Sequence, residues 1–303
     1  MRILVTGGSG HVGSWTAALL VERGHQVACL GRRPEPGPGG LPPIVCDLAD
    51  PDQVAGIASR LAEFDAVVHL AAHVPEDTWA NLPRDAQAAL DANAAGTASL
   101  LAALAAASVP ARVVHASTFE VYGAGAPAPV AESHPARPIT HYGATKLAAE
   151  TYVALHGADR GVPCCSLRLP AVYGPGDTRR RALGNFIRAA AHAAPLVVQG
   201  GGEDRRDLLY VADAARALAL AAEAGARGVY NAGSGQGWSI LEMAQAVLAA
   251  SGGGSRIEHA GRVKPRADLV LDSTRIERDL GWRAETPLAE GAAAQLAWVR
   301  GGT

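Results

Sequence analysis

The chain has 303 residues, enough for one large domain or for a domain with a smaller lobe. Its 27 basic and 29 acidic residues nearly cancel, so no excess of positive charge favours nucleic acid or an anionic membrane as a partner. Hydrophobic residues make up 49% of the chain, so a sizeable core can form. No signal peptide fits before the first strand, and we expect a cytoplasmic protein.

Short apolar runs alternate with helical patterns, which is typical of a parallel sheet with helices on both faces. We predict strands near Ile3–Thr6, Gln26–Leu30, Ile44–Cys46, Ala66–Leu70, Arg112–Ala116 and Cys164–Leu169. We predict helices near His11–Arg23, Pro51–Leu61, Asp85–Ala107 and His141–His156. The segment Gly31–Pro43 is rich in Gly and Pro and predicts a surface loop.

Beyond Tyr173 the elements become shorter, and runs of glycine or arginine separate them, which predicts a smaller lobe. One segment, near Asp207–Ala224 and Gly228–Asn231, is expected to return to the sheet. The predicted fold class is α/β, with a doubly wound parallel Rossmann sheet and a smaller C-terminal α/β substrate lobe. The predicted dinucleotide-binding domain comprises 1–172 and about 207–231, and the predicted substrate lobe comprises 173–206 and 232–303.

Glycines recur at three-residue spacing in the first turn between a strand and a helix, at Gly7, Gly10 and Gly13. A missing side chain lets the backbone turn tightly and approach a phosphate group. The helix that starts near His11 also directs the positive end of its dipole at this point. The turn, with His11 and Val12, therefore predicts a site for a dinucleotide pyrophosphate.

The second predicted strand ends in Gly31, Arg32 and Arg33. An acidic residue at this place would accept hydrogen bonds from the adenosine ribose of NAD, whereas guanidinium groups suit the 2′-phosphate of NADP. We therefore expect NADP(H) as the favoured cofactor, with NAD(H) as the alternative. The other interpretation of the arginines is two solvated side chains before a loop.

Other strand ends and one helix supply further candidate cofactor contacts. Small residues after the fourth strand leave room for a cofactor, and Asn93, in a long helix, can bridge backbone and cofactor or be a partly buried helix residue. The predicted cofactor contacts outside the glycine turn and the arginine pair are Asp47, Leu48, Leu70, Ala71, Ala72, Asn93, Tyr142, Lys146 and Pro170.

Tyr142 and Lys146 are four residues apart, on one face of a predicted helix. An ammonium group beside a phenol lowers the pKa of the phenol, which makes it a proton donor and acceptor near neutral pH. Thr118 follows the fifth strand, where its hydroxyl can hydrogen-bond a substrate oxygen, and Ser117 is the reserve. Glu120 is either a second acid–base group or a structural carboxylate. Together these residues predict hydride transfer at an alcohol carbon.

The order of these motifs resembles that of the extended short-chain dehydrogenase/reductases, specifically the NAD-dependent epimerase/dehydratase group that acts on nucleotide sugars. The resemblance covers nearly the whole chain and rests on Thr6–Gly13, Asp47–Leu48, His69–Ala72, Asn93–Thr97, Ser117–Gly123, Tyr142–Lys146, Arg168–Pro175, Arg206–Asp213, Tyr230–Gly233 and Asp279–Trp282. It implies that Thr118, Tyr142 and Lys146 are catalytic, that Lys146 holds the nicotinamide ribose, and that Arg206 binds the nucleotide diphosphate. It also implies a homodimer built on the two long helices.

Three departures from the family pattern bear on the substrate and the cofactor. Phe119 stands where family dehydratases carry a polar residue, which argues against sugar 4,6-dehydration. Ala171 replaces the Asn that usually contacts the diphosphate, so the substrate is held differently or is not a nucleotide sugar. The pair Arg32 and Arg33 departs from the acidic signature of NAD-binding epimerases.

Several polar residues of the second half have two interpretations. The run Arg179–Arg181 can contact phosphate or form a solvated loop, and Asn185 can face the substrate or cap a helix. The histidines lack the spacing of metal ligands, so we expect no metal site. The four cysteines have no paired spacing, and we expect buried thiols in a reducing compartment.

The predicted activity is NAD(P)-dependent hydride transfer at a secondary alcohol or ketone carbon of a nucleotide sugar, with C4 of a hexose as the expected carbon. A C4 epimerase that keeps its cofactor and a 4-ketoreductase that uses exchangeable NADPH fit the motifs equally. An NADPH-dependent reductase of a non-sugar carbonyl or natural-product intermediate is the alternative, which Ala171 supports. A sugar dehydratase and a non-catalytic NADP-binding protein have less support.

Overall fold

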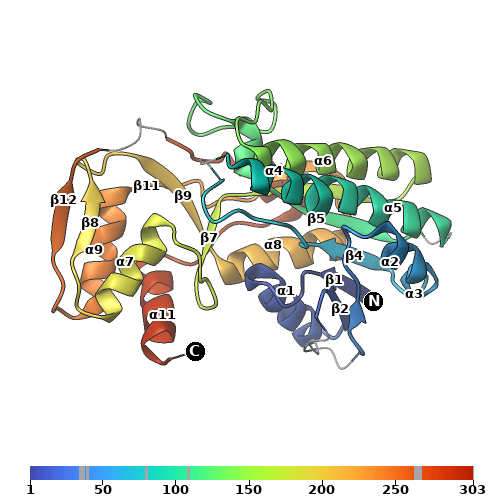
Figure 1. The fold of residues 1–303 in the computed structure, drawn as a ribbon, viewed down its shortest axis with the longest axis horizontal. Helices are drawn as coiled ribbons and strands as arrows, with labels where there is room; N and C mark the ends of the chain where they lie inside the picture. The colour runs from blue at the N-terminus through green and yellow to red at the C-terminus, as the bar shows by residue number, and fades with distance from the viewer. Residues whose placement is uncertain (34–37, 39–40, 79–80, 108–109, 263–267, 303) are drawn as a thin grey trace.

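A seven-stranded parallel sheet forms the centre of the computed structural model, which describes residues 1–33, 38, 41–78, 81–107, 110–262 and 268–302 (Figure 1). Its strands are β1 (Arg2–Thr6), β2 (Gln26–Gly31), β3 (Ile44–Val45), β4 (Ala66–His69), β5 (Arg112–Thr118), β6 (Cys164–Leu169) and β10 (Gly228–Asn231). The order β10-β6-β5-β4-β1-β2-β3 reverses direction at β1, as in a doubly wound sheet. The predicted α/β Rossmann fold is confirmed.

Helices cover both faces of this sheet, which explains why its strands are nearly continuous apolar runs. One face carries α1 (His11–Glu22) and α8 (Val211–Ala224), which pack against each other. The other carries α2 (Pro51–Gly56), α3 (Ala58–Leu61), α4 (Pro83–Ala89), α5 (Gly96–Ala106) and α6 (His141–Arg160). Central side chains such as Ile3, Leu4 and Val5 are completely buried between the layers.

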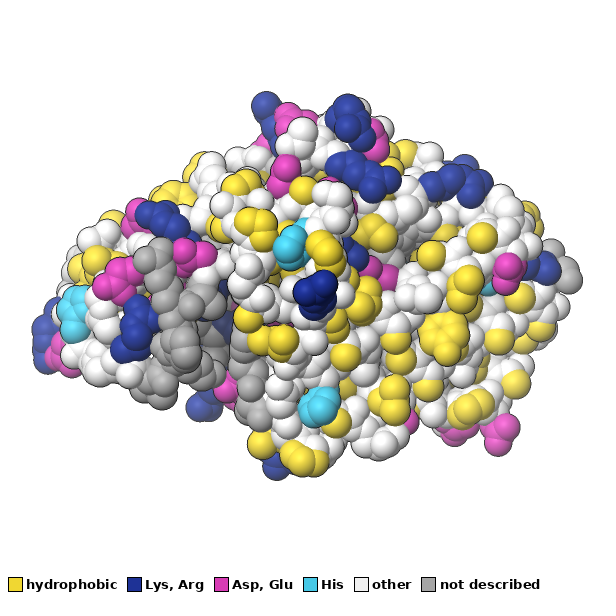
Figure 2. Space-filling view, turned by 90° about the horizontal axis from the view of Figure 1, so that it is seen from above, with side chains coloured by type: hydrophobic (Ala, Val, Ile, Leu, Met, Phe, Trp, Pro, Cys, Tyr) yellow, Lys and Arg dark blue, Asp and Glu magenta, His cyan; other side chains and the backbone are white. Residues whose placement is uncertain are grey.

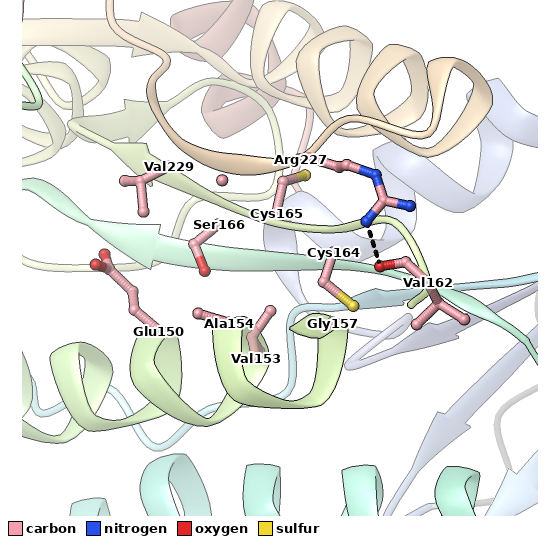
Figure 3. Close-up of a pocket in the computed structure, with 11 residues that line it drawn as sticks. Glu150, Val153, Ala154, Gly157, Val162, Cys164, Cys165, Ser166, Arg227 and Val229 are labelled. Carbon is pink, nitrogen blue, oxygen red and sulfur yellow. Dashed lines mark hydrogen bonds between the residues drawn. The ribbon is translucent and has the colours of Figure 1, made fainter. Parts of the chain in front are cut away.

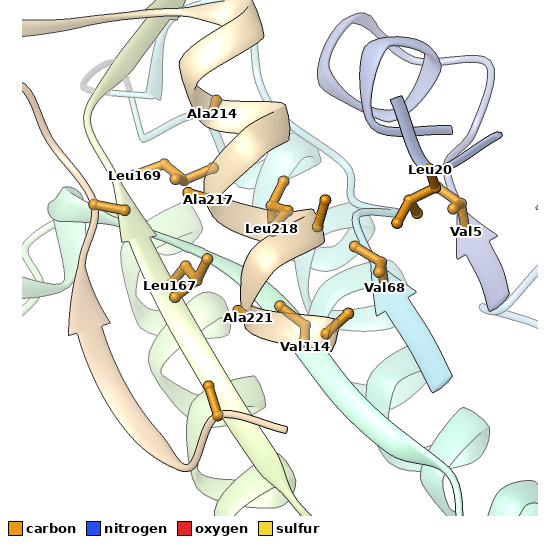
Figure 4. Close-up of a cluster of buried hydrophobic side chains, with 14 of the residues drawn as sticks. Val5, Leu20, Val68, Val114, Leu167, Leu169, Ala214, Ala217, Leu218 and Ala221 are labelled. Carbon is orange, nitrogen blue, oxygen red and sulfur yellow. The ribbon is translucent and has the colours of Figure 1, made fainter. Parts of the chain in front are cut away.

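Small residues let α8 pack closely under the sheet. Ala214, Ala217 and Ala221 are fully buried, and Leu218 lies among them in the same cluster (Figure 4). The small side chains permit a short distance between helix and strands, while leucine fills the space that remains. The alanine-rich composition of this segment therefore serves close helix packing.

The predicted helix Asp85–Ala107 is not a uniform α-helix, because a π-helical turn, η2 (Leu90–Ala95), separates α4 from α5. The combined helix Pro83–Ala106 is long and apolar enough to cross a membrane by length and composition, with a mean hydropathy of 1.2. Half of that apolar stretch is buried inside the protein, and core helices of soluble proteins have the same composition. The predicted helix Pro51–Leu61 is likewise divided, into α2 and α3.

The second half of the chain builds two small sheets with their own core, which includes Phe186, Ile187 and Met243. The strands are β7 (Ala171–Tyr173), β8 (Leu196–Gln199), β9 (Arg205–Tyr210), β11 (Gly237–Ser239) and β12 (Ile257–Ala260), in the orders β11-β9-β7 and β12-β8. The helices are α7 (Ala182–Ala191), α9 (Ile240–Ser251), α10 (Thr274–Leu280) and α11 (Leu288–Arg300).

The expected return of the chain to the central sheet occurs within the predicted segment, at its second stretch. Gly228–Asn231 forms the edge strand β10, paired in parallel with β6. Asp207, in contrast, lies on β9 in the smaller sheet, and the chain rejoins the Rossmann part through α8. The domain limits proposed from the sequence stay a prediction. The predicted loop Gly31–Pro43 lies partly outside the described residues.

Candidate active site

The glycine turn after β1 is a cradle that side chains would fill. Gly7 has φ +70°, and an added Cβ would lie 2.8 Å from the backbone nitrogen of Ala71. A Cβ on Gly13 would lie 2.1 Å from the carbonyl oxygen of Gly7, and Gly10 N–H donates to that same oxygen at 2.9 Å. Because Gly10 offers no side-chain cap, the first N–H groups of α1 suit an anion such as a pyrophosphate.

A buried chain of hydrogen bonds holds this turn to the neighbouring strand and helix. Thr97 Oγ1 donates to the carbonyl of Asn93 at 2.5 Å, so it must accept from His69 Nε2 at 2.9 Å. His69 Nδ1 then accepts from Thr6 Oγ1 at 2.7 Å, and Thr6 Oγ1 accepts from Ala71 N–H at 3.1 Å. Burial lowers the pKa of His69 to about 3, so the ring is neutral. His69 is thus a packed residue of β4.

Asn93 lies in the π-helical turn with its side chain completely buried. Its Oδ1 accepts from the His73 N–H at 2.7 Å, and its Nδ2 lies 3.0 Å from the His73 carbonyl and 3.1 Å from Thr145 Oγ1. The side chain therefore ties the loop after β4 to α6, which carries Tyr142 and Lys146. π-helical turns are often found at functional sites. Contact of Asn93 with a cofactor stays a prediction.

Thr118, Tyr142 and Lys146 are buried at the carboxyl end of β5 and in the first turns of α6. Gly143 allows this approach, because a Cβ there would lie 2.7 Å from the carbonyl oxygen of Glu120. Thr118 Oγ1 accepts from the Glu120 N–H at 3.3 Å, which leaves its own proton for another acceptor. The spacing predicted from the sequence is thus realised in a buried, closely packed corner.

The pKa values in this corner differ from the expectation. Burial, together with the carboxylate of Glu120, raises the pKa of Tyr142 to about 12, and Arg181 opposes this rise. Burial also lowers the pKa of Lys146 to about 7, with Glu150 opposing. The expected lowering of the phenol pKa is therefore wrong for this structure, because desolvation and the Glu120 carboxylate outweigh the opposing charges of Arg181 and Arg179.

Ser117, the reserve for Thr118, is engaged elsewhere. Its Oγ donates to Glu150 Oε1 at 2.5 Å, and Glu150 also accepts two hydrogen bonds from Arg168, at 3.0 and 2.7 Å. Burial alone would lower the pKa of Arg168, but the carboxylate outweighs burial and raises it. Neighbouring strand residues point to opposite faces, so Ser117 supports this buried ion pair rather than standing beside Thr118.

Glu120 is buried beside Tyr142, with both carboxylate oxygens in use. Oε1 accepts from Thr78 Oγ1 and Oε2 accepts from Thr140 Oγ1, each at 3.0 Å. Burial raises the pKa of Glu120, although the two threonines oppose the rise. These contacts favour the structural interpretation, because the carboxylate joins a loop to the start of α6.

The remaining predicted cofactor contacts lie at the edge of the sheet where open α/β folds bind ligands, the carboxyl ends of the strands. They follow β1, β2, β3, β4 and β6, and they are Gly7, Gly10, His11, Val12, Gly13, Arg32, Arg33, Asp47, Leu48, Leu70, Ala71, Ala72 and Pro170. Arg32 and Arg33 are exposed, whereas Asp47 accepts from the Ala49 N–H at 3.0 Å. Leu48 is buried.

A cavity of about 360 Å³ in the smaller lobe brings together two predicted substrate residues, Asn185 and Arg206. Arg180 and Arg262 also line it, so the cavity is rich in cations. Asn185 lies inside α7 and accepts from Arg188 at 2.8 Å, so the capping interpretation is wrong. Ala171 is not among the described residues that line the cavity. It lies on β7, opposite Leu208.

The arginine run is not a uniformly solvated loop. Arg179 donates to Asp177 at 2.9 Å and to the Val172 carbonyl at 3.0 Å, so it holds the loop after β7. Arg180 is mostly exposed. Arg181 is partly buried, and its charge acts on Tyr142 and Glu120. Nothing in the sequence of the run distinguishes these three environments.

Residues 3–233 match the NAD dependent epimerase/dehydratase family. The chain belongs to this family. The resemblance inferred from the motifs is therefore confirmed, and so is the expectation of an enzyme, because relatives in this family are NAD-dependent epimerases and dehydratases.

Both dehydratases and epimerases of the family match the chain over nearly its full length. A dTDP-glucose 4,6-dehydratase from an Actinoplanes species is 33% identical, covering 99% of this chain and 98% of the relative. The structure of the UDP-glucose 4-epimerase from Thermotoga maritima with UDP-glucose superposes with a TM-score of 0.88 at 27% identity, covering 99% of each chain. The Thermus thermophilus UDP-glucose 4-epimerase in complex with NAD gives 0.87 at 30% identity, covering all of both chains.

A second cavity, about 200 Å³ in volume, lies beside the C-terminal half of α6 (Figure 3). It is lined by Val153, Cys164 and Val229 among others, and Arg227 closes one side by donating to the Val162 carbonyl at 3.0 Å. This cavity is at the amino ends of β6 and β10, away from Tyr142. It therefore does not belong to the candidate active site.

Within the described ranges, no group of three or more His, Cys, Asp or Glu residues could hold a metal ion. All four cysteines are free and buried, as expected from their spacing. Burial raises the pKa of the Cys165 thiol to about 12, which makes it a poor nucleophile.

Proposed function

We propose that this enzyme transfers hydride at a secondary carbon of a nucleotide sugar, with Tyr142 as proton donor and acceptor. The observation that carries the proposal is that Thr118, Tyr142 and Lys146 are all buried where the first turns of α6 pack against the end of β5. The cation-rich cavity with Asn185 and Arg206 suits the nucleotide diphosphate. UDP-glucose and dTDP-glucose in the names of the relatives support a nucleotide sugar.

The residues have separate tasks in this proposal. Bound NAD(P), held by the glycine turn and Lys146, would supply or accept the hydride. Tyr142, with its pKa near 12, is a phenol at neutral pH, the form that protonates a sugar oxygen during reduction. For oxidation it must lose that proton, and the nearby cations Arg181 and Arg179 favour the phenolate. The free proton of Thr118 Oγ1 donates to the same sugar oxygen and orients it.

Epimerase and 4-ketoreductase remain the two candidate activities. The NAD found in a relative favours an epimerase. Arg32 and Arg33, exposed at the end of β2, favour NADPH and therefore a reductase. A dehydratase has support from the Actinoplanes relative, but Phe119 offers no acid or base, and Glu120 is bound by two threonines. A reductase of a non-sugar carbonyl stays the alternative that Ala171 supports.

The first test is to denature the purified protein and identify any released nucleotide by mass spectrometry, then to titrate NADH and NADPH into stripped protein. Stoichiometric NAD that exchanges slowly would support an epimerase and contradict our interpretation of Arg32 and Arg33. Protein that is empty and prefers NADPH would support a reductase. Conversion of UDP-glucose or dTDP-glucose is then followed by NMR, and Tyr142→Phe must abolish it.

We also propose a homodimer in the cytoplasm, in which α4–α5 and α6 of each subunit form a four-helix bundle. Leu90, Tyr152 and Leu155 on these helices are about half exposed, although they are large and apolar. Figure 2 looks onto this side of the molecule and shows hydrophobic side chains spread over it among few charged ones. Sedimentation at micromolar concentration tests the proposal, and a monomer throughout would contradict it.

A further inference from the structure

Glu120 is a buried carboxylate whose side-chain hydrogen bonds come from two neutral hydroxyl groups. The residue is 5% exposed, and its oxygens accept from Thr78 Oγ1 and Thr140 Oγ1, each at 3.0 Å. Among the residues that the structure describes, no basic side chain forms an ion pair with it, and the charges of Arg181 and Asp77 act on it with opposite signs. Since a protein interior screens charges weakly, the negative charge of Glu120 acts on its neighbours.

The hydrogen bonds of Glu120 include the start of the helix that carries Tyr142. Thr140 is the N-cap residue of α6, and its Oγ1 accepts from the Gly143 N–H at 3.0 Å while it donates to Glu120. A Cβ on Gly143 would lie 2.7 Å from the Glu120 carbonyl oxygen, so the two backbones are also in close contact. Tyr142 lies between Thr140 and Gly143 in the chain. Glu120 therefore fixes the helical turn that presents the phenol.

The charges around Tyr142 have opposing effects on its proton. After burial, the Glu120 carboxylate is the next cause that raises the pKa of Tyr142, whereas Arg181 and Arg179 lower it. Lys146, one turn further along α6, has a pKa of about 7 because of burial, so it is largely neutral at alkaline pH. Of these groups Glu120 is the anion, and an anion favours the protonated phenol.

We propose that Glu120 is a positioning residue that acts through Tyr142: it keeps the phenol protonated and so favours ketone reduction over alcohol oxidation. The inference rests on the proposed function and deepens it. In reduction the carbonyl carbon gains the hydride and the carbonyl oxygen gains the phenol proton, which leaves a phenolate. In oxidation the alcohol proton must pass to a phenolate, which the charge of Glu120 disfavours. Glu120 itself exchanges no proton with the substrate in either direction.

The first test follows the ionisation of Tyr142 without any substrate. Tyrosinate absorbance is recorded in the ultraviolet at rising alkaline pH for wild type and for Glu120→Gln. The same titrations with Tyr142→Phe added are subtracted, which isolates this phenol. Tyr142 should ionise at lower pH in Glu120→Gln, because the amide keeps the shape of the carboxylate without its charge. A merely structural role of Glu120 would not move this titration.

The second test measures the two directions of hydride transfer separately, in single turnovers followed by the absorbance of the reduced nicotinamide. Oxidation of UDP-glucose at neutral pH should be about two- to tenfold faster in Glu120→Gln, since one pKa unit is a tenfold change in the phenolate population. Reduction of the corresponding 4-keto sugar should not become faster. The matched control is Glu63→Gln, which neutralises an exposed carboxylate paired with Arg2 and should leave both rates and the titration unchanged.

The outcomes separate this inference from the proposed function. An unchanged Tyr142 titration in Glu120→Gln would overturn the inference, and so would the loss of both directions in a folded variant, because Glu120 would then be an acid or base itself. If Glu120→Gln does not fold, Glu120→Met combined with Thr78→Val replaces the charge and one of its partners by apolar groups, and the same shift of the titration is expected. If no protein oxidises the sugar nucleotide, the proposed function fails, while the titration still decides the effect of Glu120 on Tyr142.

Discussion

The cofactor half and the substrate half of the candidate site differ in how their polar groups are satisfied. Around the glycine turn, Thr6, His69, Thr97 and Asn93 form one continuous hydrogen-bonded chain inside the protein. Near the proposed substrate end, no hydrogen bond within the described residues engages the Arg181 side chain, although the charges of Glu120 and Asp177 act on it. The difference indicates that internal hydrogen bonds organise the cofactor half, whereas the substrate half relies on longer-range attraction between charged groups.

The largest expected effect falls where the two halves meet. Tyr142→Phe should lower turnover by about 10²- to 10⁴-fold, because it removes the proposed proton donor and acceptor. Thermal stability should change little, since no hydrogen bond within the described structure engages the Tyr142 hydroxyl. The control is Tyr152→Phe, which alters an exposed tyrosine of the same helix. Similar turnover in the two variants would contradict the assignment.

Lys146 is an exception in the well-satisfied cofactor half. Burial of its ammonium group should lower the stability of the folded protein. Its pKa is about 7 in the folded protein and 10.5 when unperturbed, so the unfolded chain binds more protons between these values. Wild-type stability should therefore rise with pH across that window, and the penalty is fully present below pH 7. Lys146→Met should be more stable by up to a few kcal/mol at pH 7, although inactive.

Urea unfolding at pH 7 and at pH 10 measures this effect. The difference between Lys146→Met and wild type should shrink as the pH rises. Burial is the largest cause that lowers the pKa values of His69 and His115, and the charge of Lys146 is the next. Both imidazoles therefore stay neutral between pH 7 and pH 10 and do not contribute to the pH dependence of stability. A constant difference would mean that Lys146 keeps its ordinary pKa.

The glycine turn should show the opposite behaviour, in which binding and stability fail together. Gly13→Ala places a Cβ against the Gly7 carbonyl and should destabilise the protein by about 1–3 kcal/mol while weakening dinucleotide binding. Gly56→Ala is the matched control, because nothing lies within 4 Å of its added Cβ. This control should be neutral or slightly stabilising, as expected for glycine in a helix. Thermal unfolding and dinucleotide titration report both properties.

The smallest expected effect concerns the exposed arginines at the end of β2. Replacing Arg32 and Arg33 together by Gln should reduce NADPH affinity about tenfold, or about 1.4 kcal/mol, and leave NADH affinity nearly unchanged. Fluorescence titration with the two dinucleotides separates these outcomes. An equal change in affinity for NADPH and NADH would show that Arg32 and Arg33 do not recognise the 2′-phosphate.

Local patterns in the sequence were sufficient for the central sheet, the glycine turn and the spacing of Tyr142 and Lys146. Each depends on near neighbours: apolar runs make buried strands, glycine spacing makes a tight turn, and four-residue spacing makes one helix face. These properties follow from backbone geometry, so the predicted fold class and strand positions agree closely with the structure.

Other features depend on contacts between distant segments and could not be read from the chain. The hydrogen bond of Ser117 to Glu150 depends on the ion pair of Glu150 with Arg168, and the π-helical turn accompanies the contact of Asn93 with His73.

The sequence by itself determined the family, the Rossmann fold and the candidate residues for hydride and proton transfer, because these are encoded in local spacing and motif order. Tertiary structure alone decided the high pKa of Tyr142, the low pKa of Lys146 and the different surroundings of three adjacent arginines. The physical reason is desolvation. Burial sets the cost of each charge, and burial depends on segments that meet only after folding.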